Sequence, residues 1–254
     1  TQPKTKLLRT SNQGISSALN NGIAACTGKY ILPLDADDKI GSTYLEKAVR
    51  VLEENAKVGI VYCKAELFGE ESGEWNLPAY RFPEILLGNV IFVSAMFRRS
   101  DWVEANGFDP SMKYGWEDFD FWLSLIEFGR EVHRIPETLF YYRKHGNSTI
   151  AKMKREHSVH SFAQLFRNHP KLYVDNIAGL LRQHPDLWLE LQRFVQGTGV
   201  VTDERLQLAW DVIETLTRKI GAQRATGRSA AAGSGDPLVG APLGSSQRGS
   251  RREL

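Results

Sequence analysis

Three aspartates lie within four residues, directly after a short apolar segment. Residues 30–34 have the composition of a buried strand, and Asp35, Asp37 and Asp38 follow it. Strands of an open sheet present ligand-binding residues at their carboxyl ends, so these acids are expected at a substrate site. Because three carboxylates repel one another, a hard divalent cation with oxygen ligands would suit them. A solvated turn rich in Asp is the alternative interpretation.

A second group of acids opens a predicted helix at residues 117–129. Glu117, Asp118 and Asp120 stand in its first turn, where the positive end of the helix dipole favours carboxylates. At helical spacing the line of Asp118 continues through Phe121, Trp122 and Leu125, and the line of Asp120 through Ser124 and Glu127. The apolar line predicts that Asp118 points into the protein or a cleft, where desolvation raises its pKa and makes it a competent proton acceptor. A structural hydrogen-bonding role is the alternative for Asp118.

One histidine follows a predicted strand at residues 134–142. A histidine at this place, His145, can bind a metal ion or serve as an ordinary surface or packing residue. The other five histidines show no spacing with acids or cysteines that indicates a ligand set: His133, His157, His160, His169 and His184. We expect His157 and His160 to be exposed.

The elements that must position these groups alternate along the first half of the chain. Apolar patterns predict helices at residues 15–26, 42–55 and 117–129, and strands at 6–9, 30–34, 58–64, 91–98 and 134–142, with a loop at 68–83. Such alternation of strands and helices is typical of a parallel α/β sheet.

The second half of the chain differs from the first in the spacing of its apolar residues. From about residue 151 the apolar residues recur at helical spacing, and beyond residue 221 the chain lacks the large apolar residues that an ordered segment needs. We therefore expect an α/β domain at 1–150, a helical extension at 151–221 and a disordered tail at 222–254. The helical extension is expected to pack on the domain or on a second copy. An interfacial membrane helix is the alternative, although no basic face stands out.

Composition limits the class of protein. A formal net charge of +2 does not indicate a nucleic-acid partner. Cys26 and Cys63 have no metal-binding spacing and are expected to be buried free thiols in a reducing compartment. No apolar run has the length of a membrane span and no signal peptide is visible, so a cytoplasmic location is expected, with the inner face of the membrane as the alternative.

Five short motifs follow one another over residues 6–149. They are Asn12-x-Gly14 with Asn20, Gly28-Lys29-Tyr30-Ile31 leading into Leu34-Asp35-Ala36-Asp37-Asp38, Gly107-Phe108-Asp109, Glu117-Asp118-Phe119-Asp120-Phe121-Trp122, and Tyr141-Tyr142-Arg143-x-His145. In this order they resemble the family-2 inverting glycosyltransferases of the GT-A fold, although each motif alone is weak. The resemblance implies a Rossmann-like α/β fold with a mixed sheet flanked by helices.

The resemblance implies a nucleotide-sugar donor at the first acid cluster. Asp35 and Asp37 match the family's Asp-x-Asp element, which holds Mn²⁺ or Mg²⁺ against the donor diphosphate, and Asp38 extends that element. His145 lies where some members place a further metal ligand, and Asn20 is expected among the donor-binding residues. The cation would neutralise the departing nucleoside diphosphate.

The resemblance also implies the catalytic groups. Asp118 matches the family's general base, and Glu117 is its neighbour in the same motif. Asp118 would take the proton from an acceptor hydroxyl, which attacks the anomeric carbon from the opposite face and inverts it in one displacement. The acceptor would be a glycan or a lipid-linked molecule, in the synthesis of a surface polysaccharide or glycolipid.

Two features depart from the family pattern, and both bear on donor binding. The chain begins near the family's third strand, so about fifty residues of the usual nucleotide-binding half are expected to be absent. Leu19 stands where many relatives carry an arginine. A non-catalytic remnant that binds no donor is therefore an alternative hypothesis. A nucleotidyltransferase is another, although the chain shows no Gly-rich phosphate loop.

Overall fold

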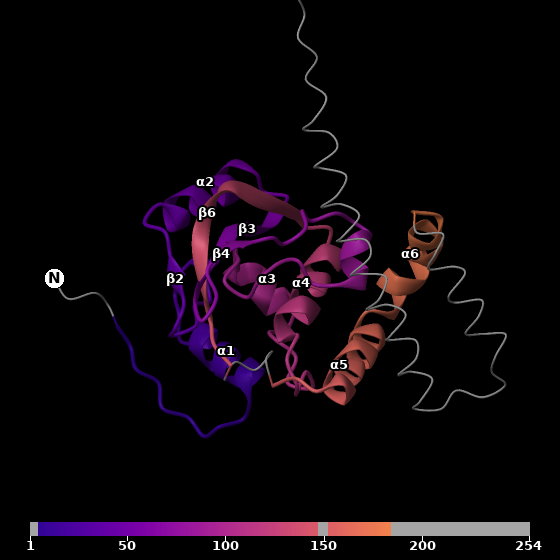
Figure 1. Ribbon diagram of the computed structural model, residues 1–254, viewed down its shortest axis with the longest axis horizontal. Helices are drawn as coiled ribbons and strands as arrows, with labels where there is room; N and C mark the ends of the chain where they lie inside the picture. The colour runs from indigo at the N-terminus through magenta and orange to yellow at the C-terminus, as the bar shows by residue number, and fades with distance from the viewer. Residues whose placement is uncertain (1–4, 147–151, 184–254) are drawn as a thin grey trace, which may run out of the picture. The chain divides into compact units, whose positions relative to one another are not determined.

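The structure is a computed structural model that describes residues 5–146 and 152–183. A mixed β-sheet lies at its centre, with helices against it (Figure 1). The strands are β1 (Tyr30–Ile31), β2 (Lys39–Ile40), β3 (Val58–Gly69), β4 (Gly73–Trp75), β5 (Met96–Arg98) and β6 (Glu131–Lys144). The helices are α1 (Ile15–Ala24), α2 (Tyr44–Glu54), the short 3-10 helix η1 (Glu84–Leu87), α3 (Arg99–Glu104), α4 (Glu117–Glu127), α5 (Arg155–Asn168) and α6 (Pro170–Gln183). The predicted mixed α/β class is confirmed.

The sheet has the strand order β1-β5-β3-β6-β2, and β4 pairs with the carboxyl-terminal part of β3. Within the described residues β3 and β6 form the parallel pair, and the other pairs are antiparallel. The expectation of a parallel sheet is therefore wrong. The chain reaches β5 through a loop and η1, without a long crossover helix, so β5 runs antiparallel to β3.

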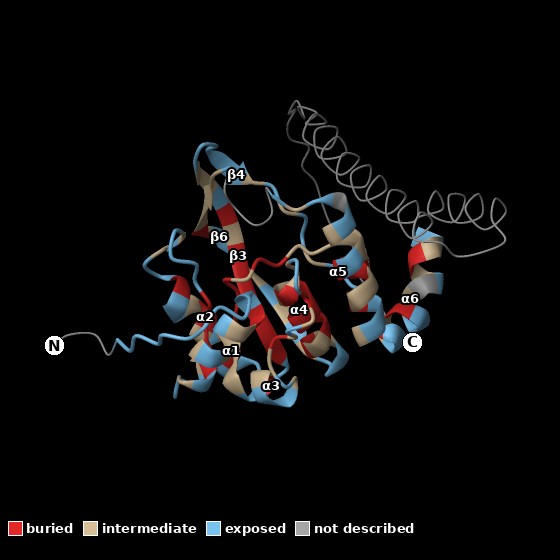
Figure 2. Cartoon of the chain, turned by 90° about the horizontal axis from the view of Figure 1, so that it is seen from below, coloured by how far each residue is buried: buried red, intermediate tan, exposed pale blue. Residues whose placement is uncertain are grey.

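The central strand β3 owes its position to an apolar sequence. Residues 58–63 are all buried, as expected for a strand with neighbours on both edges and cover on both faces (Figure 2). Its partner β6 contains Pro136, which has no N–H for the ladder. The register steps from Cys63↔Ile135 to Lys64↔Thr138, so Pro136 and the next residue form a bulge.

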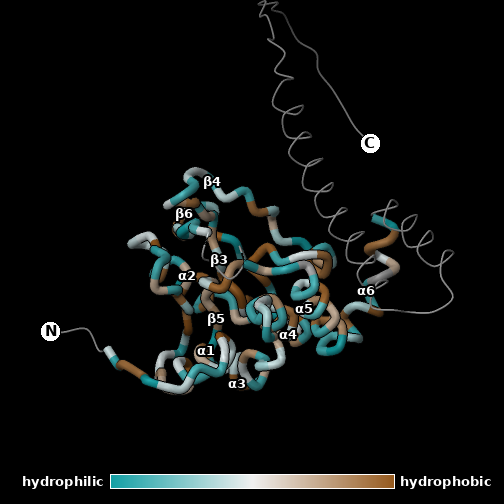
Figure 3. The backbone as a smooth tube through the Cα atoms, turned by 60° about the horizontal axis from the view of Figure 1, so that its bottom comes forward, coloured by the Kyte–Doolittle hydropathy of each residue, from teal (hydrophilic) through white to brown (hydrophobic). Residues whose placement is uncertain are grey.

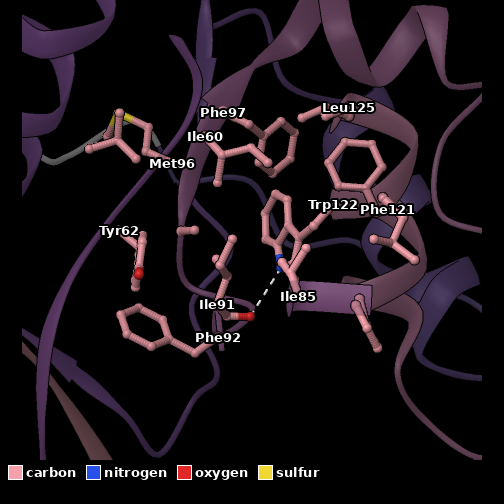
Figure 4. Packing of buried hydrophobic residues seen from close by; sticks show 14 of the residues in the cluster. Ile60, Tyr62, Ile85, Ile91, Phe92, Met96, Phe97, Phe121, Trp122 and Leu125 are labelled. Carbon is pink, nitrogen blue, oxygen red and sulfur yellow. Dashed lines mark hydrogen bonds between the residues drawn. The ribbon is translucent and has the colours of Figure 1, made fainter. Parts of the chain in front are cut away.

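Aromatic rings fill the space between the sheet and α4. The ring of Phe97 on β5 meets Phe121 and Trp122 of α4 edge-on, with centroids 4.9 and 5.8 Å away (Figure 4). The indole Nε1 of Trp122 donates a 3.1 Å hydrogen bond to the carbonyl of Ile91, which satisfies its polar atom inside the core. These contacts fix α4, the helix that carries the second acid group.

Several local predictions are wrong. Residues 6–9 form no strand, and Leu7 is exposed, because this segment has no partner in the described sheet. The strand predicted at 91–98 shrinks to β5. Cys26 is exposed just after α1, whereas Cys63 is buried as expected.

No helix within the described residues has the length and apolarity that crossing a bilayer requires. The residues beyond 183, including the predicted tail, lie outside the described part, and the domain boundaries stay predictions.

Asn20 of α1 is tied to a distant turn. Its Oδ1 accepts hydrogen bonds from the Phe108 backbone N–H (2.8 Å) and the Trp102 indole (3.0 Å), and its Nδ2 donates to the Phe108 carbonyl (2.8 Å). Gly107 lies against this amide with φ of 83°, and a Cβ there would be 2.6 Å from Asn20 Oδ1. The described contacts of Asn20 are thus structural, and its role in donor binding stays a prediction.

Replacing Gly107 by alanine should destabilise the protein more than the same change at Gly129. Both glycines have left-handed backbone (φ of 83° and 78°), which costs a non-glycine residue about 1–2 kcal/mol. Only at Gly107 does the new Cβ displace Asn20, whose hydrogen bonds contribute about 1 kcal/mol each. Urea unfolding of both variants should show a difference of about 2 kcal/mol. Equal losses would mean that the Asn20 contacts add nothing to stability.

Candidate active site

The first acid cluster occupies the loop between β1 and β2. Asp35 and Asp37 are exposed, and Asp38 is half-buried. The Asp38 backbone N–H donates to the Asp35 carbonyl (3.2 Å), which closes a turn that displays the carboxylates. β2 begins directly after the loop and pairs with β6, with Lys39 opposite Tyr141. This pairing places the loop beside the carboxyl end of β6.

The end of β6 closes on the loop through three hydrogen bonds. The Arg143 backbone N–H donates to Asp38 Oδ1 (2.8 Å), and its Nε donates to the Asp37 carbonyl (3.0 Å). His145 Nε2 lies 3.0 Å from Asp37 Oδ2. The structure therefore brings together two of the predicted metal ligands, which are 108 residues apart in the chain.

The loop concentrates negative charge. Partial burial, opposed by the Arg143 hydrogen bond and reinforced by Asp35 and Asp37, raises the pKa of Asp38 to about 6. Desolvation by neighbouring protein atoms raises the pKa of Asp35, and the negative charge of Asp37 raises it further. Asp38 Oδ2 is buried, with no hydrogen-bond partner among the described residues. A buried carboxylate oxygen without a partner is costly, and a cation would relieve that cost.

The second acid group begins α4 after an unusual turn. Gly115 has φ of 108°, and Trp116 has φ of 70°, a left-handed conformation that is rare for a bulky residue. Such backbone costs about 1–3 kcal/mol and is found preferentially at functional sites. Directly after it, Glu117 is buried, and its Oε2 has no partner within the described part of the chain.

Asp118 is held at both carboxylate oxygens. Oδ1 accepts the Phe119 backbone N–H (2.7 Å), and Oδ2 accepts Asn89 Nδ2 (3.2 Å). Burial first, and then the negative charge of Glu117, raise the pKa of Asp118 to about 8 despite these bonds. This outcome agrees with the prediction that Asp118 is desolvated, and its role as a base stays a prediction.

The two acid groups lie within electrostatic range of each other. Burial raises the pKa of Glu117, and the negative charge of Asp35 raises it further. Asp35 and Glu117 are eighty-two residues apart in sequence. The structure thus links the two acid groups electrostatically, and their sharing of one substrate site stays a prediction.

The metal prediction is met only in part by this geometry. Carboxylate and imidazole ligands suit Mn²⁺, and the two buried oxygens of Asp38 and Glu117 are unsatisfied acceptors. However, within residues 5–146 and 152–183 no three acidic, histidine or cysteine side chains come close enough to hold a metal ion. The predicted set of Asp35, Asp37 and His145 is not assembled as a three-ligand site.

The hydrogen bond between Asn89 and Asp118 was not predicted from the sequence. Besides this bond, Asn89 Oδ1 accepts the Ile91 backbone N–H (3.0 Å), which orients the amide. The sequence signal was an asparagine after Gly88 at the border of an apolar segment, a pattern typical of a side-chain turn.

Residues 2–102 match the family model described as glycosyl transferase family 2. The matched range includes the aspartate loop and ends before α4, so Glu117 and Asp118 lie outside it. The match, which includes the first two of the five motifs, confirms the resemblance to the family-2 glycosyltransferases, and the inverting mechanism stays a prediction.

Curated relatives point in the same direction. The chondroitin synthase of Escherichia coli is 27% identical over 154 residues, which cover 59% of this chain and 22% of that protein. The amylovoran biosynthesis glycosyltransferase AmsE of Erwinia amylovora is 26% identical over 167 residues, which cover 61% of this chain and 60% of that protein. The chain thus spans less than two thirds of the length of either relative.

Among solved structures, residues 1–349 of Staphylococcus aureus TarS in complex with UDP-GlcNAc align with a TM-score of 0.50. The sequences are 14% identical, and the alignment covers 63% of this chain and 48% of that one. At this identity the likeness shows the fold, and it confirms the predicted GT-A-like architecture.

The carboxyl group of Asp118 should titrate near pH 8 in the metal-free protein. The change Glu117→Gln should lower this pKa, because it removes a neighbouring negative charge, and Asn89→Ala should raise it, because it removes a donor to the carboxylate. Carbon-13 NMR of the carboxyl resonance, assigned with Asp118→Asn, measures these shifts. A titration near pH 4 in the unmodified protein would contradict the burial of Asp118.

Proposed function

We propose that this chain, whose residues 2–102 carry a glycosyl transferase family 2 domain, transfers a sugar from a nucleotide-sugar donor to a hydroxyl acceptor. The relatives named for chondroitin and amylovoran synthesis support a place in polysaccharide synthesis. The acceptor would be a growing glycan or a lipid-linked sugar.

The observation that supports this proposal most is the electrostatic influence of Asp35 on Glu117, which links the two acid groups. Asp35 influences the charge state of Glu117, and the next residue, Asp118, is the desolvated carboxyl. A diphosphate bound over the β1–β2 loop would therefore place its sugar next to Asp118. Holding two reactants in this way can contribute several kcal/mol to the lowering of the barrier.

The donor side needs positive charge. Asp35, Asp37 and His145 would hold Mn²⁺ or Mg²⁺, which supplies charge neutralisation for the leaving nucleoside diphosphate. The Asp37–His145 contact presents two of these side chains together, and Arg143 fixes the loop backbone beneath them. The Arg143 guanidinium also lies 4.5 Å from the Phe68 ring, which restricts its position.

The acceptor side needs a base. Asp118 accepts the proton of the acceptor hydroxyl while that oxygen bonds to the anomeric carbon and the bond to the diphosphate breaks. Attack opposite the leaving group inverts the anomeric carbon. Asn89 keeps the Asp118 carboxylate oriented, and a raised pKa suits a base that must take a proton from an alcohol.

A donor screen tests the proposal. The purified chain should release nucleoside diphosphate from one nucleotide sugar of a panel that includes UDP-GlcNAc and GDP-mannose, and only when Mn²⁺ or Mg²⁺ is present. Asp118→Asn should lower transfer by roughly 100-fold or more and leave donor binding intact, because it removes the base alone. Asp37→Ala should remove both transfer and the metal dependence of donor binding.

Asp175→Ala is the matched control, because Asp175 is an exposed aspartate on α6 that pairs with Lys171. It should leave transfer and binding unchanged. No nucleotide binding at millimolar concentration with Mn²⁺ would identify the chain as a non-catalytic remnant. Release of pyrophosphate in place of a nucleoside diphosphate would indicate nucleotidyl transfer.

A further inference from the structure

The junction between α5 and α6 contacts α4 at its polar line. Asp120 of α4 is buried, although the predicted line of Asp120, Ser124 and Glu127 is polar. The residues that cover it are Asn168 and His169, and α5 lies beside α4 in Figures 2 and 3. The histidine was among those without a predicted ligand set.

His169 lies between two carboxylates. Its Nε2 is 3.1 Å from Asp120 Oδ1, its Nδ1 is 2.8 Å from Glu127 Oε2, and the side chain is 3% exposed. A neutral imidazole has one N–H, whereas two ionised carboxylates require two donors, so this geometry fits the imidazolium form. Burial opposes the charge, yet the two carboxylates raise the pKa of His169 overall.

Asn168 links the same site to a third element. Its Nδ2 donates to Asp120 Oδ1 and to Asp109 Oδ2, both at 2.7 Å. Asp109 follows the Gly107–Phe108 turn that Asn20 of α1 holds. Asn168 therefore connects α4 to that turn.

α5 also contacts the loop before α4. The buried Ser161 hydroxyl donates to the Gly115 carbonyl (3.2 Å), and the His157 ring stacks on Tyr114 with centroids 4.2 Å apart. The helical pair thus touches both the strained turn before Glu117 and the polar line behind it.

We propose that His169 and Asn168 are positioning residues, which hold α4 so that Asp118 meets the acceptor at the site proposed above. They touch no substrate and act through Asp120, Glu127 and Asp109. α4 carries Glu117 and Asp118 in its first turn, so a small rotation of the helix moves both carboxylates. A displacement of about 1 Å at a reacting group can cost roughly 100-fold in rate.

The contacts of His169 and Asn168 with Asp120, Glu127 and Asp109, here called the clamp, depend on pH with a definite sign. The titratable or charged groups that face it are Asp120 and Glu127 of α4, Asp109 of the turn, and Lys171 and Tyr173 of α6. Because the pKa of His169 is raised on folding, its contribution is complete below the ordinary histidine pKa. It is lost as the pH rises through the raised value.

Hydrogen–deuterium exchange on the full chain, without any ligand, tests the clamp. His169→Gln and Asn168→Ala should each lower the protection of the amides at residues 117–121 by about 10-fold or more at pH 6, and the difference between His169→Gln and the unmodified protein should shrink as the pH rises to 9, because the unmodified protein loses its imidazolium there. Arg182→Ala, an exposed residue near the end of α6 whose side chain bonds to the Ala178 carbonyl, is the control and should leave exchange unchanged. Circular dichroism checks that each variant is folded.

Kinetics separate positioning from simple stabilisation. With the donor found in the screen, His169→Gln should lower kcat by about 10-fold to 100-fold and change KM little, as expected for a misplaced base. Unchanged exchange at 117–121 in both folded variants would overturn the clamp. If the chain transfers no sugar while exchange responds as expected, the proposed function fails and the clamp stands.

Discussion

Repulsion among carboxylates is the constraint on which the site depends. Asp35 and Glu117 act on each other electrostatically, and one oxygen each of Asp38 and Glu117 is buried without a partner in the described residues. Outside the folded protein these carboxylates would be hydrated and free to move apart. The backbone of the fold must therefore hold them together. The left-handed Trp116 before α4 shows that this holding includes conformational strain. A cation bound among these carboxylates would relieve this repulsion, which is the physical reason for the metal that we propose.

β6 positions the aspartate loop between β1 and β2. It pairs in parallel with β3 and antiparallel with β2. The pairing with β2 fixes the loop that precedes β2 beside the end of β6. The bulge at Pro136 accommodates a residue that cannot donate a hydrogen bond to the ladder, and regular pairing resumes at Thr138. Beyond that point Arg143 and His145 contact the aspartate loop. A proline that is locally unfavourable in a strand therefore marks the change of register between the two halves of β6, of which the second contacts the aspartate loop.

Sequence reasoning succeeded where local pattern decides structure. The apolar segment of β3 and the amphipathic α2 and α4 formed as predicted. Asp37 and His145, which the family resemblance names as metal ligands, lie in contact, and that role stays a prediction. It failed where pairing decides, because residues 6–9 have strand composition but no described partner strand. It also could not find the bond between Asn89 and Asp118, since nothing in the sequence spacing connects residues that meet only through tertiary packing.

The polar line of α4 shows why the helical extension matters to the fold. Most residues of α4 are buried, Asp120 among them, so the Asp120 carboxylate must be satisfied within the protein, whereas Glu127 lies at the exposed end of the helix. Asp120 and Glu127 require donors, and a single imidazolium between them supplies two, while the Asn168 amide adds a third and reaches Asp109. An apolar junction would leave the buried Asp120 carboxylate without these donors. The junction therefore satisfies a buried charge on the same helix that presents Asp118.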